Sequence, residues 1–364
     1  MTMQRLMTRA WVEIDLGALV RNAERYARAA GVPILPMIKA DAYGLGAERV
    51  AHALLALSPP PWGFGVATIE EGADLRRADI QLPILVVSPL LPTQFDAARR
   101  HELTPLLGDP SAITKWAKTG RPWHLMIDTG MGRAGVPWRD MASVRDAVAA
   151  HPPDGVCTHF HSSQLPNGSR EEQERRFAAA VAELPLAAQL LHADNSGAIE
   201  HRAPSPYGLA RPGIFLYGVG SGHDAQVTPD PVVALRARVI EIRVVQEGDT
   251  VSYDASWRAP RSGRIATIAI GYADGYRRVL GNRAQALLNG ARVPVVGYVT
   301  MDMTMLDVTD KPCKPGDVVT LIGNDGKDSI SVADVAAAGS LSPYEVLTGL
   351  RGRLPRVYLT AEDA

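Results

Sequence analysis

The run ILPMI at residues 34–38 is followed closely by the run AERVAHALLAL at residues 47–57. The first run is short and apolar, as expected of a buried strand, and the second consists of good helix formers. A parallel sheet is built from such pairs, because the helix returns the chain to the start of the next strand. These residues therefore predict one strand-helix unit of a parallel sheet.

The same unit recurs between residues 15 and 235. Eight short apolar runs are candidate strands, at residues 34–38, 63–66, 84–87, 103–106, 124–127, 155–158, 190–192 and 207–210. Most of them precede helix-like sequence, of which residues 69–77 and 171–183 are clear further examples. Eight units within about 220 residues match the usual size of a closed (β/α)8 barrel better than an open sheet. We therefore predict a barrel over residues 15–235.

After residue 235 the apolar pattern changes to period two. The alternation is typical of antiparallel strands, and it occurs at residues 236–244, 264–270, 292–299 and 303–308. Residues 9–14 alternate in the same way, so we expect the segment 1–14 to pair with this second domain. The predicted fold class is α/β, with an N-terminal (β/α)8 barrel followed by a mostly antiparallel β domain over residues 236–364.

Composition argues against several kinds of partner. The 38 Lys and Arg residues nearly balance 39 Asp and Glu, and the basic residues are scattered, which disfavours a nucleic-acid partner. No uncharged apolar run approaches the roughly 20 residues of a membrane span, and residues 1–11 lack the apolar core of a signal peptide. Cys157 and Cys313 fall in different predicted domains, and neither belongs to a C-x-x-C pair. We expect a cytoplasmic protein without a disulfide framework or a membrane partner.

Polar residues that are unusual in a barrel follow several of the predicted strands. In barrel enzymes the working residues stand at the carboxyl ends of the strands. Here such residues follow the first, fifth, sixth, seventh and eighth predicted strands, in the order Lys39, Arg133, His159, Asn195 with Ser196, and Arg211. The sequence therefore predicts that these side chains meet in one site.

The setting of Lys39 distinguishes it from an ordinary solvated lysine. It ends an apolar strand that would desolvate its amine, and a desolvated amine loses its proton more easily and can bond covalently to a carbonyl carbon. The amides of Gly213 and Ile214, together with the hydroxyl of Ser196, could bind a phosphate, as barrels often do after the seventh and eighth strands. Taken alone, however, the Gly213 segment is better interpreted as a tight turn.

The segment His159-Phe160-His161 leaves a metal site open as an alternative. An H-x-H pair at a barrel mouth can bind zinc, and Asp128 and His192 could complete the ligands of a hydrolase. Metal hydrolases of this fold usually carry the pair on the first strand, and the two arginines of the predicted site would repel a divalent cation. We therefore predict no metal, with His161 as a structural or hydrogen-bonding neighbour.

The motif IKADAYGLG at residues 38–46 resembles the cofactor-lysine signature of the alanine racemases, barrel enzymes that use pyridoxal phosphate (PLP). Seven further motifs match in the family's order across both predicted domains. They are DTGMGR at 128–133, THF at 158–160, NS at 195–196, RPGI at 211–214, VSY at 251–253, IGYADG at 270–275 and MD at 301–302. Ordered matches to eight motifs are much rarer than a chance match to one.

The resemblance implies roles for the barrel residues. Lys39 would bind PLP covalently and act as the base on one face of the substrate. Arg211 would face the pyridine nitrogen with His192 behind it, while His159 would lie beside the ring and Arg133 would bind the substrate carboxylate. The other implied cofactor-binding residues are Tyr43, Asn195, Ser196, Gly213 and Ile214.

The resemblance also implies roles for the second domain, which the partner subunit would contribute. Tyr253 would be the base on the other face of the substrate, and the backbone amide of Met301 would bind the substrate carboxylate. Tyr272 would line the substrate site, with Asp302 in support. The implied protein is a homodimer with shared active sites that racemises L- and D-alanine and supplies D-alanine for peptidoglycan.

Elementary chemistry supports this division of roles. Racemisation removes a proton from one face of Cα and returns one to the other, so it needs two opposed acid-base groups. Arg211 beside the pyridine nitrogen would keep that nitrogen unprotonated, because two buried positive charges repel. A free tyrosine has a pKa near about 10, so Tyr253 needs a nearby positive network, which Arg211 could supply through His159.

Three positions depart from the family pattern. Met126 stands where the family often has a carbamylated lysine, which would leave Arg133 without its anionic neighbour unless a small anion or another side chain replaces it. Tyr298 replaces an arginine, and Gly352 replaces a tyrosine that would narrow the substrate entrance. These departures leave open a racemase of broader specificity that accepts serine or larger amino acids.

Two alternatives within PLP chemistry also remain. An amino-acid decarboxylase of this fold usually has an acidic residue at the pyridine nitrogen, where this chain has Arg211. A non-catalytic PLP carrier would need only the barrel, so the second domain and Tyr253 count against it.

Overall fold

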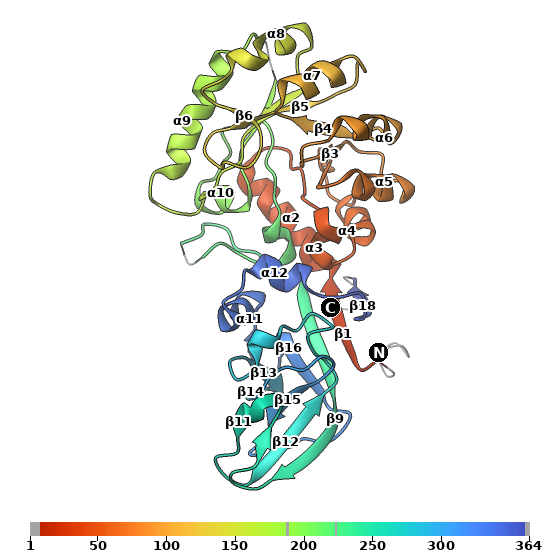
Figure 1. Cartoon of the computed structure of the whole chain (residues 1–364), viewed down its shortest axis with the longest axis vertical. Coiled ribbons are helices and arrows are strands. Elements are labelled where there is room, and N and C mark those ends of the chain that lie inside the picture. The colour runs from red at the N-terminus through yellow and green to blue at the C-terminus, as the bar shows by residue number, and fades with distance from the viewer. Residues whose placement is uncertain (1–7, 187–188, 223, 361–364) are drawn as a thin grey trace. The chain divides into compact units, whose positions relative to one another are not determined.

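The computed structural model describes residues 8–186, 189–222 and 224–360, and the chain divides into two compact units (Figure 1). The barrel unit is Leu19–Asp230, and the β unit combines Met1–Ala18 with Pro231–Ala364. The first boundary falls inside helix α2 (Leu16–Ala30), and the second falls between the predicted strands at 207–210 and 236–244. Residues 1–7 and 361–364 of the predicted segments 1–14 and 236–364 lie outside the described residues.

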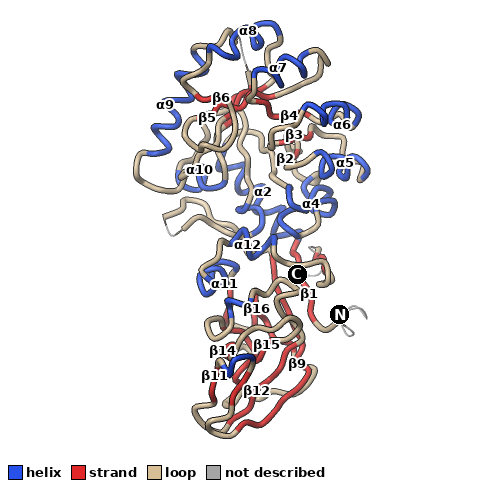
Figure 2. The backbone as a smooth tube through the Cα atoms, viewed as in Figure 1, coloured by secondary structure: helices blue, strands red, loops and turns tan. Residues whose placement is uncertain are grey.

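The barrel unit contains a curled parallel sheet in the order β2-β3-β4-β5-β7-β8, with β6 beside β5. Its strands are β2 (Phe64–Val66), β3 (Ile84–Val86), β4 (Thr104–Leu107), β5 (His124–Asp128), β6 (Val136–Pro137), β7 (Gly155–Cys157) and β8 (Leu190–His192). Helices lie outside these strands in Figure 2. Six of the eight predicted strands are therefore ladder strands of this sheet.

Two predicted strands, 34–38 and 207–210, are instead held by single parallel bridges. The bridges pair Ile34 with Ala210 and Met37 with Gly65. Hydrogen bonds such as Leu35 N to Ala210 O (2.8 Å) and Ile38 N to Gly65 O (2.9 Å) complete the ring. Prolines at 33, 36, 206 and 212 explain the difference, because a proline donates no backbone hydrogen bond. The barrel closes, but its first and last positions are irregular.

Helices connect the strands of the barrel unit. After α2 they are α3 (Lys39–Gly44), α4 (Ala47–Leu54), α5 (Ile69–Arg77), α6 (Phe95–Arg100), α7 (Pro110–Ala117), α8 (Ala142–Ala150), α9 (Ser169–Ala182) and α10 (Ser196–His201), with 3-10 turns η1 (Pro92–Gln94) and η2 (Ile214–Tyr217). The helix predicted over 47–57 ends at Leu54. Three successive prolines at 59–61 explain the early end, because a proline cannot continue a helix and disfavours helical geometry in the residue before it.

The β unit is a nine-stranded sheet in the order β17-β16-β13-β14-β15-β12-β9-β1-β18, in which β16 also pairs with β9. All its pairings are antiparallel except that of β1 with β18. The strands are β1 (Ala10–Asp15), β9 (Val233–Val245), β12 (Gly263–Ile268), β13 (Gln285–Leu288), β14 (Ala291–Val296), β15 (Thr304–Asp307), β16 (Val318–Asp325), β17 (Asp328–Ile330) and β18 (Arg356–Leu359). A separate two-stranded sheet pairs β10 (Thr250–Val251) with β11 (Trp257–Arg258).

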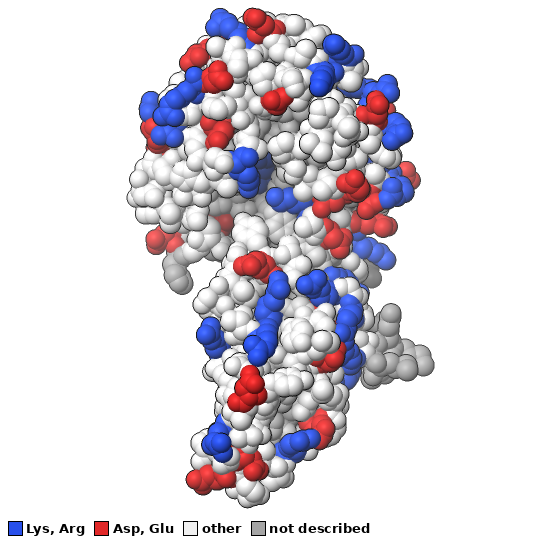
Figure 3. Space-filling model, viewed as in Figure 1, with Lys and Arg blue, Asp and Glu red and all other residues white. Residues whose placement is uncertain are grey.

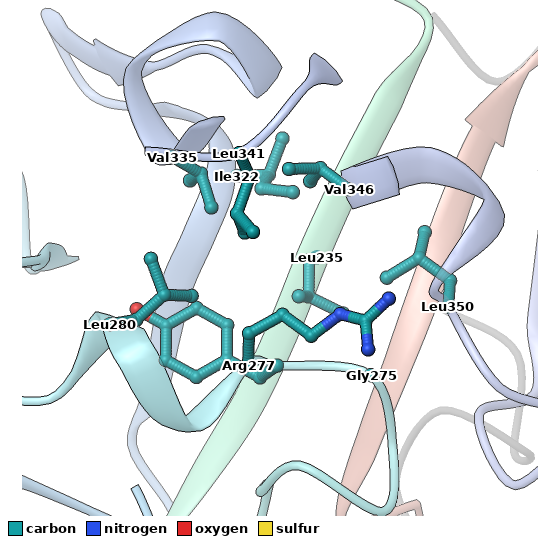
Figure 4. Close-up of a pocket in the computed structure, with 10 residues that line it drawn as sticks. Leu235, Gly275, Arg277, Leu280, Ile322, Val335, Leu341, Val346 and Leu350 are labelled. Carbon is teal, nitrogen blue, oxygen red and sulfur yellow. The ribbon is translucent and has the colours of Figure 1, made fainter. Parts of the chain in front are cut away.

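Two helices, α11 (Val332–Gly339) and α12 (Pro343–Thr348), pack on this sheet in the β unit. Figure 4 shows the contact, where Leu235 of β9 and Ile322 of β16 meet Val335 of α11 and Val346 of α12. The cavity left between them is about 10 Å³, roughly the room of one water molecule. The interface is therefore close-packed.

Charged side chains of both signs are interspersed over the visible face of each unit (Figure 3). No helix among the described residues is both long and apolar enough to cross a membrane.

Candidate active site

Lys39 stands where the first barrel segment ends, at the start of a left-handed turn. Residues 40–43 all have φ between 52° and 58° and none of them is glycine. Left-handed geometry costs an L-residue roughly 1–2 kcal/mol, so four such residues in a row need support from their surroundings. Backbone strain of this kind is typical of functional sites.

The Lys39 side chain is half-buried, and its Nζ makes no hydrogen bond or ion pair with any described residue. Burial lowers the pKa of this amine, the nearby Arg133 guanidinium lowers it further, and the Glu71 carboxylate opposes the shift. An unpartnered amine with a lowered pKa is suited to covalent bonding and to proton transfer.

Arg211 is a buried cation whose hydrogen-bond partners are all uncharged groups. Its Nη1 donates to the carbonyl of His192 at 2.7 Å and lies 2.7 Å from Nδ1 of the same residue. Its Nη2 donates to the carbonyls of Thr158 (2.8 Å) and Ala193 (3.1 Å). Nε donates to no described residue. The guanidinium is thus fixed from one side and keeps one donor for a bound molecule.

Three histidines accompany Arg211. Nε2 of His192 lies 2.8 Å from Nδ1 of His124, and Nδ1 of His159 lies 3.5 Å from Nη2 of Arg211. Burial and then Arg211 lower the pKa of all three, to about 4 for His124 and about 3 for His159. All three rings are therefore neutral near pH 7. The sequence analysis missed His124, although a histidine opening an apolar strand was a visible signal.

The surroundings of His159 indicate what the site attracts. After burial and Arg211, the charges that lower its pKa are Arg133 and Lys39, and no carboxylate acts on it. The three cations of the predicted site therefore lie close enough to act on one imidazole. Such a site favours an anionic ligand.

Ser196 and η2 form a cradle of phosphate-binding type. The Ser196 hydroxyl accepts hydrogen bonds from the amides of Gly213 (2.9 Å) and Phe215 (3.4 Å). A Cβ on Gly213 would lie only 2.6 Å from the Tyr43 hydroxyl, so glycine is needed for this approach. Ile214 opens η2 next to Gly213. The hydroxyls of Ser196 and Tyr43 thus lie beside the backbone amides of η2.

Asn195 acts through α10. Its Oδ1 accepts from the amide of Ala198 (3.1 Å) and the hydroxyl of Ser163 (2.6 Å), and its carbonyl accepts from the Tyr26 hydroxyl (2.8 Å). These bonds make it the N-cap of the helix. Asn195 therefore fixes the position of Ser196.

Arg133 is exposed and makes no hydrogen bond or ion pair with any described residue. Solvent can therefore hydrate this guanidinium, and the expectation that a small anion or another side chain accompanies Arg133 stays a prediction. Met126, where the family often has lysine, packs its sulfur 3.4 Å from that of Cys157, beside Leu106. Apolar contact fills that position, and Arg133 remains available to an anion.

His161 is exposed, and its Nδ1 lies 2.8 Å from the Ser162 hydroxyl. Its amide donates to Oε1 of Gln173 (3.0 Å), whose amide nitrogen donates to the carbonyl of His159 (3.1 Å). Gln173, which the sequence analysis did not select, thus connects both ends of the H-x-H segment. Across the described parts of the chain, no group of three or more His, Cys, Asp or Glu side chains is arranged to hold a metal ion.

The predicted residues of the β unit lie on exposed loops. Tyr253 opens the turn η3 (Tyr253–Ala255), its side chain is 68% exposed, and its hydroxyl bonds to no described residue. Met301 is 53% exposed, and its amide likewise donates to none of them. Tyr272, 39% exposed, is held next to Met301 by a bond from its amide to the carbonyl of Thr300 (2.9 Å). These groups are accessible to a partner or ligand.

Arg353 ties the two loops of the β unit together. Its Nη2 donates to Asp302 (2.7 Å), beside Met301, and its Nε lies 3.3 Å from the buried carboxylate of Asp274. Asp274 in turn accepts from the amide of Gly271 (3.0 Å), beside Tyr272. Asp302 therefore supports this junction. The sequence analysis missed Arg353 because its partners are far away in the chain.

Comparison with known proteins places these features in a family context. A model of the alanine racemase N-terminal domain matches residues 14–221, and one of the alanine racemase C-terminal domain matches residues 232–358. The chain is 39% identical over 365 residues to an alanine racemase of Acidiphilium cryptum, covering 96% of this chain and 99% of that one. It is 36% identical over 370 residues to an alanine racemase of Nostoc, covering 96% and 95%.

Solved structures are similar over nearly the whole length. An alanine racemase of Bartonella henselae with covalently bound pyridoxal phosphate is 30% identical with a TM-score of 0.89, covering 97% of this chain and 100% of that one. An alanine racemase of E. faecalis is 28% identical with a TM-score of 0.90, covering 96% and 98%. A histidine racemase of Leuconostoc mesenteroides is 26% identical with a TM-score of 0.86, covering 97% and 98%.

Proposed function

Because the chain belongs to the alanine racemase family, we propose that it interconverts L- and D-alanine by a two-base mechanism with Lys39 and Tyr253. The observation that carries this proposal is the cluster of Lys39, Arg133 and Arg211 around His159, with no carboxylate acting on that imidazole. Such a cluster suits an anionic cofactor and the carboxylate of an amino acid.

The cofactor of the family is pyridoxal phosphate, and the residues here fit it. The free amine of Lys39 would bind it covalently, and the unused Nε of Arg211 would donate to the pyridine nitrogen. The cradle would hold the phosphate, with Tyr43, Ser196 and the amides at Gly213 and Ile214. When bound, the cofactor draws electron density away from the substrate Cα.

Two groups on opposite faces would move the Cα proton. Nζ of Lys39 takes or returns it on one face, which its lowered pKa favours near neutral pH. The Tyr253 hydroxyl serves the other face. Arg133 and the amide of Met301 hold the substrate carboxylate, since neither has another partner among the described residues. Beside Met301, Tyr272 lines the substrate site and Asp302 supports the loop that carries Met301.

The fixed charge of Arg211 would set the chemistry of the site. Its three histidine neighbours are neutral, and a guanidinium beside the pyridine nitrogen disfavours a proton on that nitrogen. Neutral His159 is free to accept or donate a hydrogen bond toward Tyr253. This connection would link the Tyr253 hydroxyl to Arg211 in the assembled site.

We propose a homodimer in which each site combines the barrel unit of one chain with the β unit of the other. The exposed Tyr253 and Met301 support this arrangement, because catalytic groups usually lie in enclosed sites. A closed two-fold pair yields two equivalent sites. D-Alanine made by such an enzyme would serve peptidoglycan synthesis.

Broader specificity is the second candidate function. A Cβ on Gly352 would meet no atom within 4 Å, so the position gives open space where the family has a tyrosine. Similarity to a histidine racemase is consistent with a larger substrate.

The test combines a spectrum with chiral analysis. The purified protein should absorb visible light from its bound cofactor and should convert L-alanine into an equal mixture of both forms. A coloured protein that inverts no amino acid would refute the proposal and favour a carrier. Inversion of serine or a larger amino acid, but not of alanine, would favour the second candidate.

A further inference from the structure

The Glu71 carboxylate binds the backbone directly after two neighbouring strands of the barrel, the first segment at 34–38 and β2. Oε1 of Glu71 accepts a hydrogen bond from the amide of Ala40 (2.7 Å), directly after Lys39. Oε2 accepts from the amide of Ala67 (2.7 Å), directly after β2, and from that of Thr68 (3.3 Å). Glu71 belongs to the first turn of α5, so this helix is tied to the residue that follows the cofactor lysine.

The first half of the turn after Lys39 depends on such bonds, because packing covers only the second half, where Ala42 and Tyr43 are buried. Ala40 and Asp41 are exposed, and a cavity of about 430 Å³ adjoins the turn, lined in part by Ile38, Asp41 and Glu71. Residues 40–43 are nevertheless left-handed throughout. Packing can hold the buried residues Ala42 and Tyr43, whereas the exposed residues Ala40 and Asp41 must be held by hydrogen bonds.

Asp41 ties the exposed half of the turn to the segment that follows it. Its Oδ1 accepts from the amide of Ala47 (2.8 Å), at the start of α4, and its carbonyl accepts from Gly46 (2.9 Å). The near end, at Ala40, has Glu71. Since Lys39 lies just before Ala40, Glu71 fixes the backbone from which the lysine side chain projects.

We propose that Glu71 is a positioning residue for Lys39, holding the left-handed turn so that Nζ points to the cofactor carbonyl. The inference rests on the proposed role of Lys39. The competing explanation is that Glu71 serves α5 alone, because it also forms a capping box with Thr68. That explanation predicts a loss of stability without any effect on the amine.

Four variants separate the two explanations. Glu71→Gln keeps one acceptor oxygen, but its NH2 cannot accept from the second amide, so one of the two strand ends is released. Glu71→Asp keeps the charge on a shorter side chain. Thr68→Ala removes the capping bond and the bond of its side chain to Glu70, and it leaves in place the backbone amides that bind Glu71. Glu70→Gln removes a charge from the same exposed turn.

Each protein is stripped of cofactor, then mixed with pyridoxal phosphate, and the rate of covalent capture is followed by absorbance. Reduction with borohydride and peptide mass spectrometry give the fraction of Lys39 modified, and a pH titration of the absorbance gives its midpoint. Thermal unfolding of the stripped protein reports stability.

We expect Glu71→Gln to slow capture by on the order of tenfold to a hundredfold, because small misplacements of a reacting group cost that much. Its absorbance midpoint should move to lower pH, since a negative charge near the amine is lost. Glu71→Asp should slow capture while moving the midpoint less. Thr68→Ala and Glu70→Gln should match the wild type in capture and midpoint, even if Thr68→Ala melts earlier.

Equal capture rates and midpoints in Glu71→Gln and Thr68→Ala would overturn the inference. If Glu71→Gln does not fold, wild-type capture in a folded Glu71→Asp protein would overturn it instead. Modification of a lysine other than Lys39 in the wild type would overturn both this inference and the proposed site. If Lys39 is modified in the wild type but the Glu71 variants behave like the wild type, the positioning role is wrong and the proposed function still holds.

Discussion

Nη1 of Arg211 lies 2.7 Å from Nδ1 of His192, and this contact fixes the protons of the histidines behind it. An arginine can only donate, so His192 accepts at Nδ1 and carries its own proton on Nε2. That proton is donated over 2.8 Å to Nδ1 of His124. The buried charge is thus oriented by a directed chain of neutral rings.

Replacing His192 by phenylalanine should destabilise the protein. The change removes one acceptor of a buried guanidinium, and an unsatisfied buried donor costs about 1–3 kcal/mol. Urea unfolding should give a free energy lower by about that amount, while His192→Asn, whose carbonyl can accept, should recover part of it. His161→Phe, at an exposed position, is the control. Equal stability of His192→Phe and His161→Phe would contradict the proposed orientation.

Stability should fall on mild acidification. The pKa of His124 is lowered from 6.5 to about 4 by burial and Arg211, and that of His192 is lowered too. Between about pH 6.5 and 4 the unfolded chain therefore binds protons that the folded chain does not, so the free energy of unfolding decreases as pH falls through this window. The slope is at most about 1.4 kcal/mol per pH unit for each histidine.

The measurement is urea unfolding at several pH values from 7.5 to 4.5. Near pH 7.5 these histidines contribute little slope, because they are mostly neutral in both the folded and the unfolded chain. In His124→Gln the dependence should be shallower, since one titrating group is gone. A profile with the same slope in both proteins would show that His124 is not protonated on unfolding.

Periodicity was enough to predict most of the fold, because apolar runs report burial directly. Residues 69–77 form α5 as predicted, and the alternation at 236–244 lies within β9. The irregular closure at 34–37 escaped prediction, because proline removes bonds without changing the apolar pattern. A pattern in one segment reports the burial of that segment, whereas closure of the barrel depends on hydrogen bonds to segments elsewhere in the chain.

The sequence predicted which residues belong to the candidate site but not how they are arranged in space. The left-handed turn at 40–43 has no glycine, the usual signal of positive φ, so nothing local reveals it. The contacts of Glu71 and Arg353 join segments that are distant in sequence, 31 residues apart for Ala40 and Glu71 and 51 for Asp302 and Arg353. Such pairs become visible only when the strands and loops are assembled.

Mixing two inactive variants should restore activity if the sites are shared. Lys39→Ala should lose both covalent cofactor and turnover, and Tyr253→Phe should keep the cofactor but lose turnover in at least one direction. After subunit exchange, half of the dimers are mixed and carry one intact site of two, so roughly a quarter of wild-type activity should return. No recovery after exchange, verified by mass spectrometry of the intact dimers, would place each site within one chain.

Breaking the Arg353 junction should weaken substrate binding more than folding. The Arg353–Asp302 pair is about half exposed, and Arg9 would still pair with the buried Asp274 carboxylate (2.9 Å), so loss of Arg353 should change stability by only about 1 kcal/mol. Arg353→Gln should nevertheless loosen the loop that carries Met301 and raise KM for alanine. Arg292→Gln is the matched control, because it breaks an equally exposed pair with Asp328 in the same unit. Equal KM values in the two variants would remove Arg353 from the substrate site.

Gly352→Tyr tests the width of the substrate entrance. A Cβ at this position meets no atom within 4 Å, so a larger side chain fits without forcing its neighbours apart. Tyr298, the other departure from the family, has its ring covered by the Arg278 guanidinium, whose central carbon lies 4.0 Å from the ring centre. The Tyr298 ring is therefore already in contact with Arg278. Gly352 remains the position at which this chain lacks a tyrosine ring that the family has.

A tyrosine at 352 would narrow the opening beside the substrate Cβ. Pockets discriminate by about 1–3 kcal/mol per methylene, so we expect kcat/KM for serine to fall by roughly tenfold relative to alanine. Cofactor affinity should rise only slightly, because one added neutral hydrogen bond is worth about 0.5–1.5 kcal/mol. Gly352→Phe separates the two effects, since it supplies the ring without the hydroxyl. If both variants leave the ratio of alanine to serine unchanged, the glycine does not set the specificity, and Tyr298 with Arg278 becomes the position to vary.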